Sequence, residues 1–226
     1  MIKVMPKSDY YIREIQLNDI DEVSRIHQAS FHDRALSLLG LGAVRRYYLW
    51  LLTGFTEIYP ICVETKDGTL AGFCFDGIYA GSFNGFLRKN AWYLIGSMLL
   101  RPWLLHNPIV RDQTKLAIST LKRTIRTRLR KFGRTTARPR PRIGSNPSSS
   151  LGVLSIAVDP AFQRQGIGQL LMHEVERIAL ENKYIQLHLS VHPENISAVN
   201  FYLELGWQKA LLNETWNGKM FKRLQG

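Results

Sequence analysis

Apolar residues recur along this chain with two different periods, and the two periods predict two kinds of element. Short apolar runs, several with a period of two, predict strands at residues 11–16, 61–64, 70–79, 153–158, 184–191, 208–212 and 215–223. Spacings of three and four predict helices at residues 20–27, 36–52, 86–100, 109–132, 168–182 and 196–205. Strands and helices are therefore interleaved along the chain, as in an α/β or α+β fold.

The second and third predicted strands form a hairpin across a turn at Asp67 and Gly68. In a two-residue hairpin register Cys62 lies opposite Phe73, so Cys74 points to the other face of the sheet. The two cysteines are therefore expected to be separate buried thiols rather than a redox pair.

Positive charge is concentrated in one part of the chain. Residues 83–142 hold 15 of the 30 lysines and arginines but only one of the 18 acidic residues, Asp112. We predict a helical basic insertion at 83–133, between the third and fourth strands, and a flexible linker at 134–150. Residues 1–226 are expected to form a single domain that includes both segments. The second helix of the insertion carries an apolar seam made of Ile118, Leu121, Ile125, Leu129 and Phe132.

The basic insertion suggests an anionic partner. Membrane lipid, nucleic acid and a phosphorylated small molecule are the candidates, and a solvated basic face without a partner is the alternative. Nucleic acid is disfavoured because no recognised binding module accompanies the charge. An amphipathic basic helix with Trp92, Tyr93 and Trp103 nearby would suit weak contact with an anionic membrane through 83–133.

The distribution of apolar residues predicts neither a signal peptide nor a membrane-spanning helix. No long apolar core follows the first residues, so no signal peptide is indicated. The longest uncharged apolar stretches, 47–56 and 91–100, are shorter than the about 20 residues that cross a bilayer. We expect a cytoplasmic protein whose contact with membranes is peripheral. No metal site is predicted, because the histidines show no ligand spacing with cysteines or acids.

A glycine-bearing turn joins the strand at 153–158 to the helix at 168–182. It reads Gln-Arg-Gln-Gly-Ile-Gly over residues 163–168. Such a turn presents unpaired amides at the positive end of a helix dipole, which suits phosphate oxygens. The glycine spacings of the Walker and dinucleotide motifs are absent. The turn therefore predicts a site for a different phosphorylated ligand.

Two motifs resemble those of the GNAT superfamily of acyl-CoA-dependent N-acyltransferases. Gln163, Gly166 and Gly168 match its Arg/Gln-x-x-Gly-x-Gly/Ala signature. Downstream, the run from Asn195 to Trp207 is similar to its Asn-x-x-Ala-x-x-Phe-Tyr-x-x-x-Gly-Phe element. The resemblance implies a mixed, mostly antiparallel central sheet flanked by helices, whose fourth and fifth strands splay apart to admit the pantetheine arm of acetyl-CoA.

The resemblance also implies roles for individual residues. In the fourth strand, main-chain groups would pair with pantetheine and polarise the thioester carbonyl. Asn195 would contact the cofactor, cap its helix, or do both. Tyr202 would protonate the departing thiolate, unless it is a core aromatic like its neighbour Phe201. The residues expected to bind acetyl-CoA are Ile156, Ala157, Val158, Gln163, Arg164, Gln165, Gly166, Ile167, Gly168, Gln169 and Asn195.

The general base is left open by the sequence. Many relatives in the superfamily carry a glutamate early in the fourth strand, where this chain has Gly152. Asp76, His188, Ser190 and water are the remaining candidates, and an amine that arrives neutral needs no base.

The predicted activity is direct transfer of an acetyl group from acetyl-CoA to a primary amine of a small molecule. The basic insertion disfavours cationic acceptors and favours an amine that carries phosphate, such as a nucleotide-linked amino sugar. Acetylation of a protein or peptide, and a non-catalytic acyl-CoA-binding module at the membrane, are the alternatives. The acyl chain preference and the oligomeric state stay undefined.

Overall fold

A seven-stranded mixed sheet forms the centre of the molecule in the computed structural model, which describes residues 10–54, 57–78, 82–101 and 150–224. The strand order is β1-β2-β3-β4-β5-β7-β6. Every neighbouring pair is antiparallel except β4 and β5. This confirms the predicted sheet. Its strands are β1 (Tyr10–Glu14), β2 (Ile58–Thr65), β3 (Leu70–Gly77), β4 (Ser150–Val158), β5 (Gln186–Ser190), β6 (Gln208–Leu212) and β7 (Thr215–Arg223).

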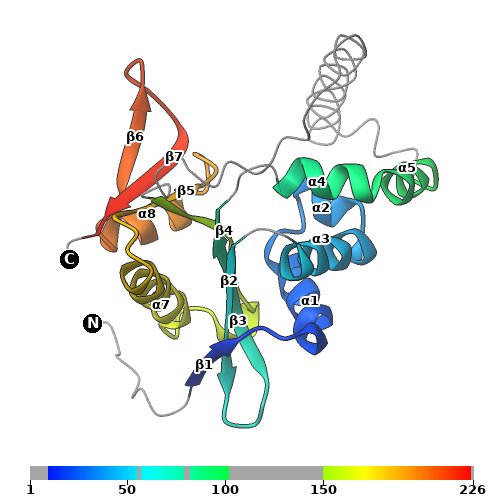
Figure 1. Cartoon of the computed structure of the whole chain (residues 1–226), viewed down its shortest axis with the longest axis horizontal. Helices are drawn as coiled ribbons and strands as arrows, with labels where there is room; N and C mark the ends of the chain where they lie inside the picture. The colour runs from blue at the N-terminus through cyan, green and yellow to red at the C-terminus, as the bar shows by residue number, and fades with distance from the viewer. Residues whose placement is uncertain (1–9, 55–56, 79–81, 102–149, 225–226) are drawn as a thin grey trace, which may run out of the picture.

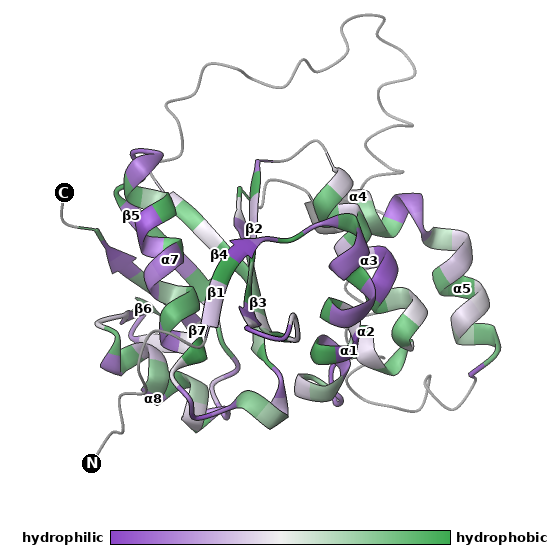
Figure 2. Cartoon of the chain, turned by 90° about the horizontal axis from the view of Figure 1, so that it is seen from below, coloured by the Kyte–Doolittle hydropathy of each residue, from purple (hydrophilic) through white to green (hydrophobic). Residues whose placement is uncertain are grey.

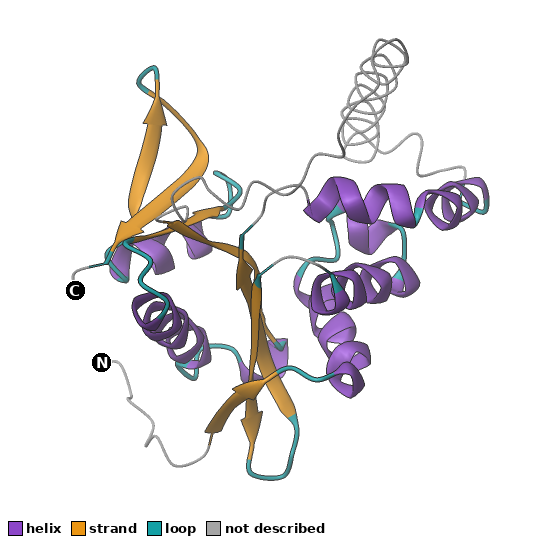
Figure 3. Ribbon diagram, in the orientation of Figure 1, coloured by secondary structure: helices purple, strands orange, loops and turns teal. Residues whose placement is uncertain are grey.

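Helices cover both faces of the first four strands (Figure 1). One face carries α1 (Ile20–Ser30), α3 (Leu41–Thr53) and, beside them, α2 (Ala35–Leu38), α4 (Ser82–Lys89) and α5 (Ala91–Leu99). The opposite face carries α7 (Ile167–Glu181) (Figure 3). The last helix, α8 (Ile196–Glu204), leads from β5 into the β6–β7 hairpin.

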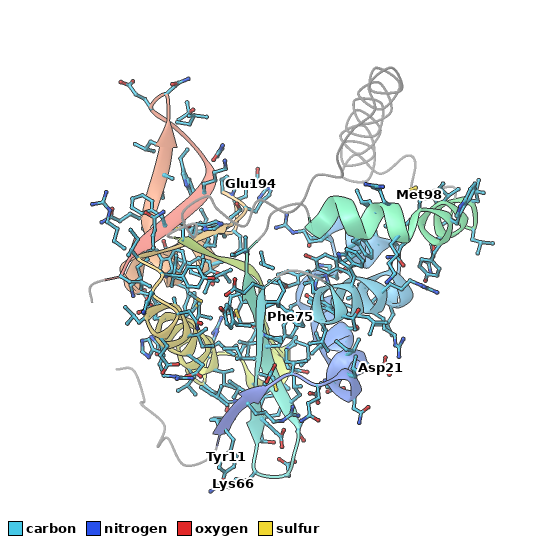
Figure 4. The ribbon with its side chains drawn as sticks, viewed as in Figure 1. Tyr11, Asp21, Lys66, Phe75, Met98 and Glu194 are labelled. Atoms are coloured by element: carbon cyan, nitrogen blue, oxygen red, sulfur yellow. The ribbon has the colours of Figure 1, made fainter. Side chains whose placement is uncertain are left out.

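Each face has its own apolar core. The α3-side core is centred on Tyr48, Phe73 and Phe75, whose rings contact one another. Figure 4 labels Phe75 on the sheet. The α7-side core contains Leu171, Val175 and the other buried residues of α7. Helix α7 is amphipathic and carries both apolar and polar residues (Figure 2). Because neighbours in a strand point to opposite faces, single strands contribute to both cores.

The two cysteines lie as predicted. Cys62 pairs with Phe73 in the β2–β3 register and belongs to the α3-side core. Cys74 lies one residue further along β3 and belongs to the α7-side core. Both thiols are free and buried, and burial raises the pKa of each above its usual value. The sheet itself therefore separates them.

Two of the predicted helices are each divided in two. The helix predicted at 36–52 is interrupted at Gly40, whose φ of +93° cannot continue a right-handed helix. The helix predicted at 86–100 is interrupted at Asn90, whose side-chain amide donates to the carbonyl oxygen of Phe86 at 3.1 Å. The apolar period continued across both breaks, so the predictions of single helices were wrong.

Part of the predicted insertion can be compared with the structure. Helices α4 and α5 form its first part. The helix predicted at 109–132, its apolar seam and nearly all of the linker predicted at 134–150 lie outside the described residues. Ser150 is not linker, because it begins β4. In the described part of the chain, no helix has the length and apolar character needed to span a membrane.

Candidate acyl-CoA site

The sheet opens into a fork between β4 and β5. These strands pair over only three residues each, from Ser150–Gln186 to Gly152–His188. Beyond Gly152, β4 continues to Val158 in register with β3 alone. Its backbone at Ile156, Ala157 and Val158 therefore has one edge in the sheet and one edge turned toward the fork. The predicted splaying of the fourth and fifth strands is confirmed.

A bulge shapes β4 just inside the fork. The β3–β4 register shifts between Phe75 and Asp76, so that Phe75 pairs with Ser155 and Asp76 with Val153. Leu154 is the extra residue, and it packs against the α3-side core. Ser155 also points to that side, because its hydroxyl lies 2.7 Å from the hydroxyl of Tyr48. The bulge thus changes which face the residues of β4 point to, close to where its pairing with β5 ends.

The turn predicted to hold phosphate follows β4 and a short 3-10 helix, Pro160–Phe162. Gly166 is the residue before α7, with a left-handed φ of +83°, and a Cβ added there would meet no atom within 4 Å. The first helical bond of α7 runs from the amide of Leu170 to the carbonyl oxygen of Gly166 at 3.0 Å. The amides of Ile167, Gly168 and Gln169 precede that bond and lie at the helix start. This is the geometry of an anion site.

Other side chains brace the turn. Gln163 donates to the carbonyl oxygen of Val158 at 3.2 Å, and Gln165 accepts a hydrogen bond from the hydroxyl of Tyr10. Arg164 has a left-handed φ of +62° and is exposed, free to turn to an anionic ligand. Gly168 differs from Gly166: a Cβ there would lie 3.2 Å from the ring of Phe201. Gly168 therefore lets α7 and α8 approach each other.

Helix α8 brings the second motif to the same region. The side chain of Asn195 accepts a hydrogen bond from the amide of Ala198 at 3.1 Å and caps the helix. Of the two adjacent aromatics, Tyr202 is the more buried, with its ring 5.2 Å from that of Phe201 and 5.8 Å from that of Trp207. Burial raises the pKa of the Tyr202 phenol above its usual value. Tyr202 is thus a core residue that keeps its proton at neutral pH.

The three side chains predicted as candidate bases divide between the two faces. Asp76 lies on the α7 side, fully buried, and neither carboxylate oxygen has a hydrogen-bond partner in the described part of the chain. Burial, with a smaller effect of Glu174, raises the pKa of Asp76 to about 8. His188 and Ser190 occupy exposed positions of β5 that alternate with the buried Leu187 and Leu189.

Sequence analysis did not predict a hydrogen-bonded relay that runs from the buried His27 to Ser155 in the fork strand β4. His27 Nδ1 lies 2.6 Å from the hydroxyl of Tyr48, which in turn lies 2.7 Å from that of Ser155. Burial lowers the pKa of His27 to about 4, so the ring is neutral at physiological pH. The residues are 21 and 107 positions apart in the chain, and no local pattern could have joined them.

A model of the GNAT acetyltransferase family matches residues 132–207, which include β4, the turn, α7, β5 and α8. This match lies on the elements that form the fork. Residues 132–207 thus match the GNAT acetyltransferase family, and the fold is similar to that of solved GNAT structures.

Solved structures of the GNAT fold cover nearly the whole chain. The ribosomal-protein-S18-alanine N-acetyltransferase of Escherichia coli is 14% identical with a TM-score of 0.54, covering 96% of this chain and 95% of that one. The PaiA N-acetyltransferase of Thermoplasma acidophilum, solved with coenzyme A, is 13% identical with a TM-score of 0.52, covering 95% and 98%.

A third similar structure is the spermidine N-acetyltransferase of Vibrio cholerae, solved with CoA and spermine. It is 12% identical with a TM-score of 0.53, covering 96% of this chain and 97% of that one. At these identities the similarity describes the fold, and the acceptors named differ from one structure to the next. None of the curated proteins compared with the chain matches it. The described residues contain no group of three or more potential ligands placed to hold a metal ion.

Proposed function

We propose that this protein is a GNAT enzyme that transfers an acetyl group from acetyl-CoA directly to a primary amine of a small anionic molecule. The fork between β4 and β5 carries the proposal, because it lies beside the anion-binding turn at the start of α7. Pantetheine would lie along the free edge of β4 at Ile156, Ala157 and Val158. The pyrophosphate would meet the amides of the turn at 163–168 and Gln169.

The transfer needs no covalent enzyme intermediate. The amine nitrogen attacks the thioester carbon, a new C–N bond forms, and the C–S bond breaks. A β4 amide would stabilise the developing oxyanion. Tyr202 would give its proton to the departing thiolate, because a phenol is protonated at neutral pH. Asn195 would contact the cofactor from the start of α8.

Charge supports an anionic acceptor. Residues 83–142 carry 15 basic residues and one acid, so an acceptor with a phosphate group is attracted and a polycation is repelled. A nucleotide-linked amino sugar combines a primary amine with such a group. This acceptor class distinguishes the proposal from acetylation of spermidine or of a lysine-rich peptide.

A screen of acceptors tests the proposal. Thiol release from acetyl-CoA would be followed with nucleotide-linked amino sugars, spermidine and alanine- or lysine-containing peptides as acceptors. We expect the highest kcat/KM with an amino sugar. A peptide as the best acceptor would favour the alternative of protein acetylation, for which the similarity to the S18-alanine enzyme is the supporting observation. Binding of acetyl-CoA without turnover for any amine would favour a non-catalytic module.

Exposed apolar residues on α5 support peripheral membrane contact as a second property. Trp92 is 87% exposed and Leu100, just after the helix, is 81% exposed, and Arg88 and Lys89 lie on the preceding helix. Helix α5 lies at the outer edge of the helical layer (Figure 1). Aromatic and apolar residues beside cations suit an anionic lipid surface. Sedimentation with phosphatidylserine vesicles should be weakened by Trp92→Glu and by added salt.

A further inference from the structure

His188 lies where the fork begins. It is the last residue of β5 that pairs with β4, and Gly152 is its partner. Both lie on the α3 side of the sheet, because Leu151, Val153, Leu187 and Leu189 all point into the α7-side core. His188 is exposed on that side, as is Ser190 two residues later.

The imidazole is fixed by two neighbours. Its Nδ1 lies 2.7 Å from the hydroxyl oxygen of Ser150. Its Nε2 lies over Gly152, at 2.8 Å from where a Cβ of that residue would be. Any side chain at position 152 would therefore displace the ring. The glycine leaves room for a nitrogen base at the point where the two strands diverge.

We propose that His188 is the general base of the acetyl transfer and that Ser150 is the residue that positions it. The inference rests on the proposed function and names the group that receives the amine proton. The sequence left this role open among three side chains and water.

The proton transfer assigns each ring nitrogen a role. Nδ1–H donates to the hydroxyl oxygen of Ser150, which leaves the Nε2 lone pair free to face the acceptor. As the amine nitrogen bonds to the thioester carbon, its proton moves to Nε2. The imidazolium then releases the proton to solvent, which its exposed position allows.

The other side chains are less suited to this role. Asp76 is fully buried on the opposite face of the sheet, so its carboxylate cannot reach an amine on the side of His188. Ser190 is exposed, but a hydroxyl is too weak a base to hold the proton of an amine near neutral pH. His27 is buried and committed to Tyr48.

The charges near His188 favour a neutral ring. Strand β4 carries no titratable side chain. On β7, Phe221 lies directly opposite His188, and the cations Lys219 and Arg223 lie two positions away on the same face. Although His188 is exposed, partial desolvation by the surrounding residues lowers its pKa below the usual value. The ring can therefore accept a proton at physiological pH.

The first test reads the ring directly and needs no acceptor. In the full-length protein with nitrogen-labelled histidine, NMR would identify the neutral tautomer of His188. We expect the proton on Nδ1, with Nε2 unprotonated. Ser150→Ala should disturb this tautomer, while His173→Gln, an exposed helix position, should leave it unchanged. A proton held on Nε2 in the wild-type protein would overturn the proposal.

The second test is kinetic and uses the best acceptor of the screen. His188→Gln should lower kcat/KM about a hundredfold or more and remove the decline of kcat/KM on the acid side of the pH profile. Acetyl-CoA affinity should stay unchanged. His173→Gln should behave like the wild type. An active His188→Gln protein with the wild-type pH profile would refute the base role alone, whereas a wild-type protein inactive toward every amine would refute the proposed function and the base role together.

Discussion

The two faces of the sheet hold their polar groups in different ways. On the α3 side, His27, Tyr48 and Ser155 form a continuous relay, and His188 is fixed by Ser150. On the α7 side, Asp76 is buried without a hydrogen-bond partner in the described part of the chain. The comparison teaches that hydrogen bonds fix the positions of the α3-side groups, whereas burial without a partner, with a smaller effect of Glu174, raises the pKa of Asp76. A strongly shifted pKa is therefore a weaker guide to the reacting face than geometry.

The largest expected effect is on cofactor binding at the start of α7. Gly166→Glu should reduce acetyl-CoA binding below detection in calorimetry, because it places a carboxylate beside the amides that would hold the pyrophosphate. Gly166→Asn is the matched control, since asparagine tolerates the left-handed backbone and carries no charge. If Gly166→Glu binds as well as the wild type, the turn is not the phosphate site.

The next largest effect is on the pH dependence of stability, and it concerns Asp76, the carboxyl on the α7 side. The pKa of Asp76 is raised to about 8 in the folded protein, so its contribution to stability is fully present below pH 3.8 and is lost as the pH rises through 8. Asp76→Asn should remove this loss, a gain of up to roughly 6 kcal/mol above pH 8. Denaturant unfolding from pH 4 to pH 9 measures it. An unchanged pH dependence would mean that Asp76 has a partner in solution.

Tyr202 belongs to the α7-side core and yet is proposed to act in the fork. Tyr202→Phe keeps the ring, so the melting temperature and the acetyl-CoA affinity should stay close to the wild type. Turnover should fall about a hundredfold, because the thiolate would leave without its proton donor. Steady-state kinetics and calorimetry on the same preparation separate these outcomes. Full turnover would return Tyr202 to a structural role.

The smallest effect concerns the α3-side relay. Tyr48→Phe removes the hydroxyl that joins His27 to Ser155 and should destabilise the fold by about 1.5 kcal/mol, because the buried His27 and the half-buried Ser155 lose their partner. Ser155→Ala removes only one end and should cost less. Chemical denaturation compares the two. Equal stability of Tyr48→Phe and the wild type would show that the relay contributes orientation only.

Much of the fold followed from local pattern. The bounds of β6 and β7 are those predicted, and Cys62 pairs with Phe73 as predicted, although the β2–β3 register shifts between Val63 and Glu64. Breaks at Gly40 and Asn90 were missed because a single backbone dihedral or side-chain bond ends a helix without changing the apolar period. Element existence was therefore predictable where element boundaries were not.

The site was predictable in part. The turn at 163–168 could be predicted because its glycines lie between a strand and a helix that are its neighbours in the sequence. The position of His188 over Gly152 depends on a parallel strand pair between residues 36 positions apart, and the β4 bulge depends on register with β3. Such tertiary relations leave no local trace. The alternation of side chains tells which neighbours in a strand share a face with Asp76 or His188. It does not tell which face of the folded sheet that is.

The short β4–β5 pairing has a consequence for how the molecule opens. Three paired residues on each strand are the whole ladder between the half of the sheet built from β1 to β4 and the half built from β5, β7 and β6. A pantetheine arm that bonds to the free edge of β4 would act as a substitute strand. Without the cofactor, amide hydrogens should exchange fastest along the β4–β5 pairing. The cofactor should couple the two halves of the sheet, otherwise separate cooperative units, into one.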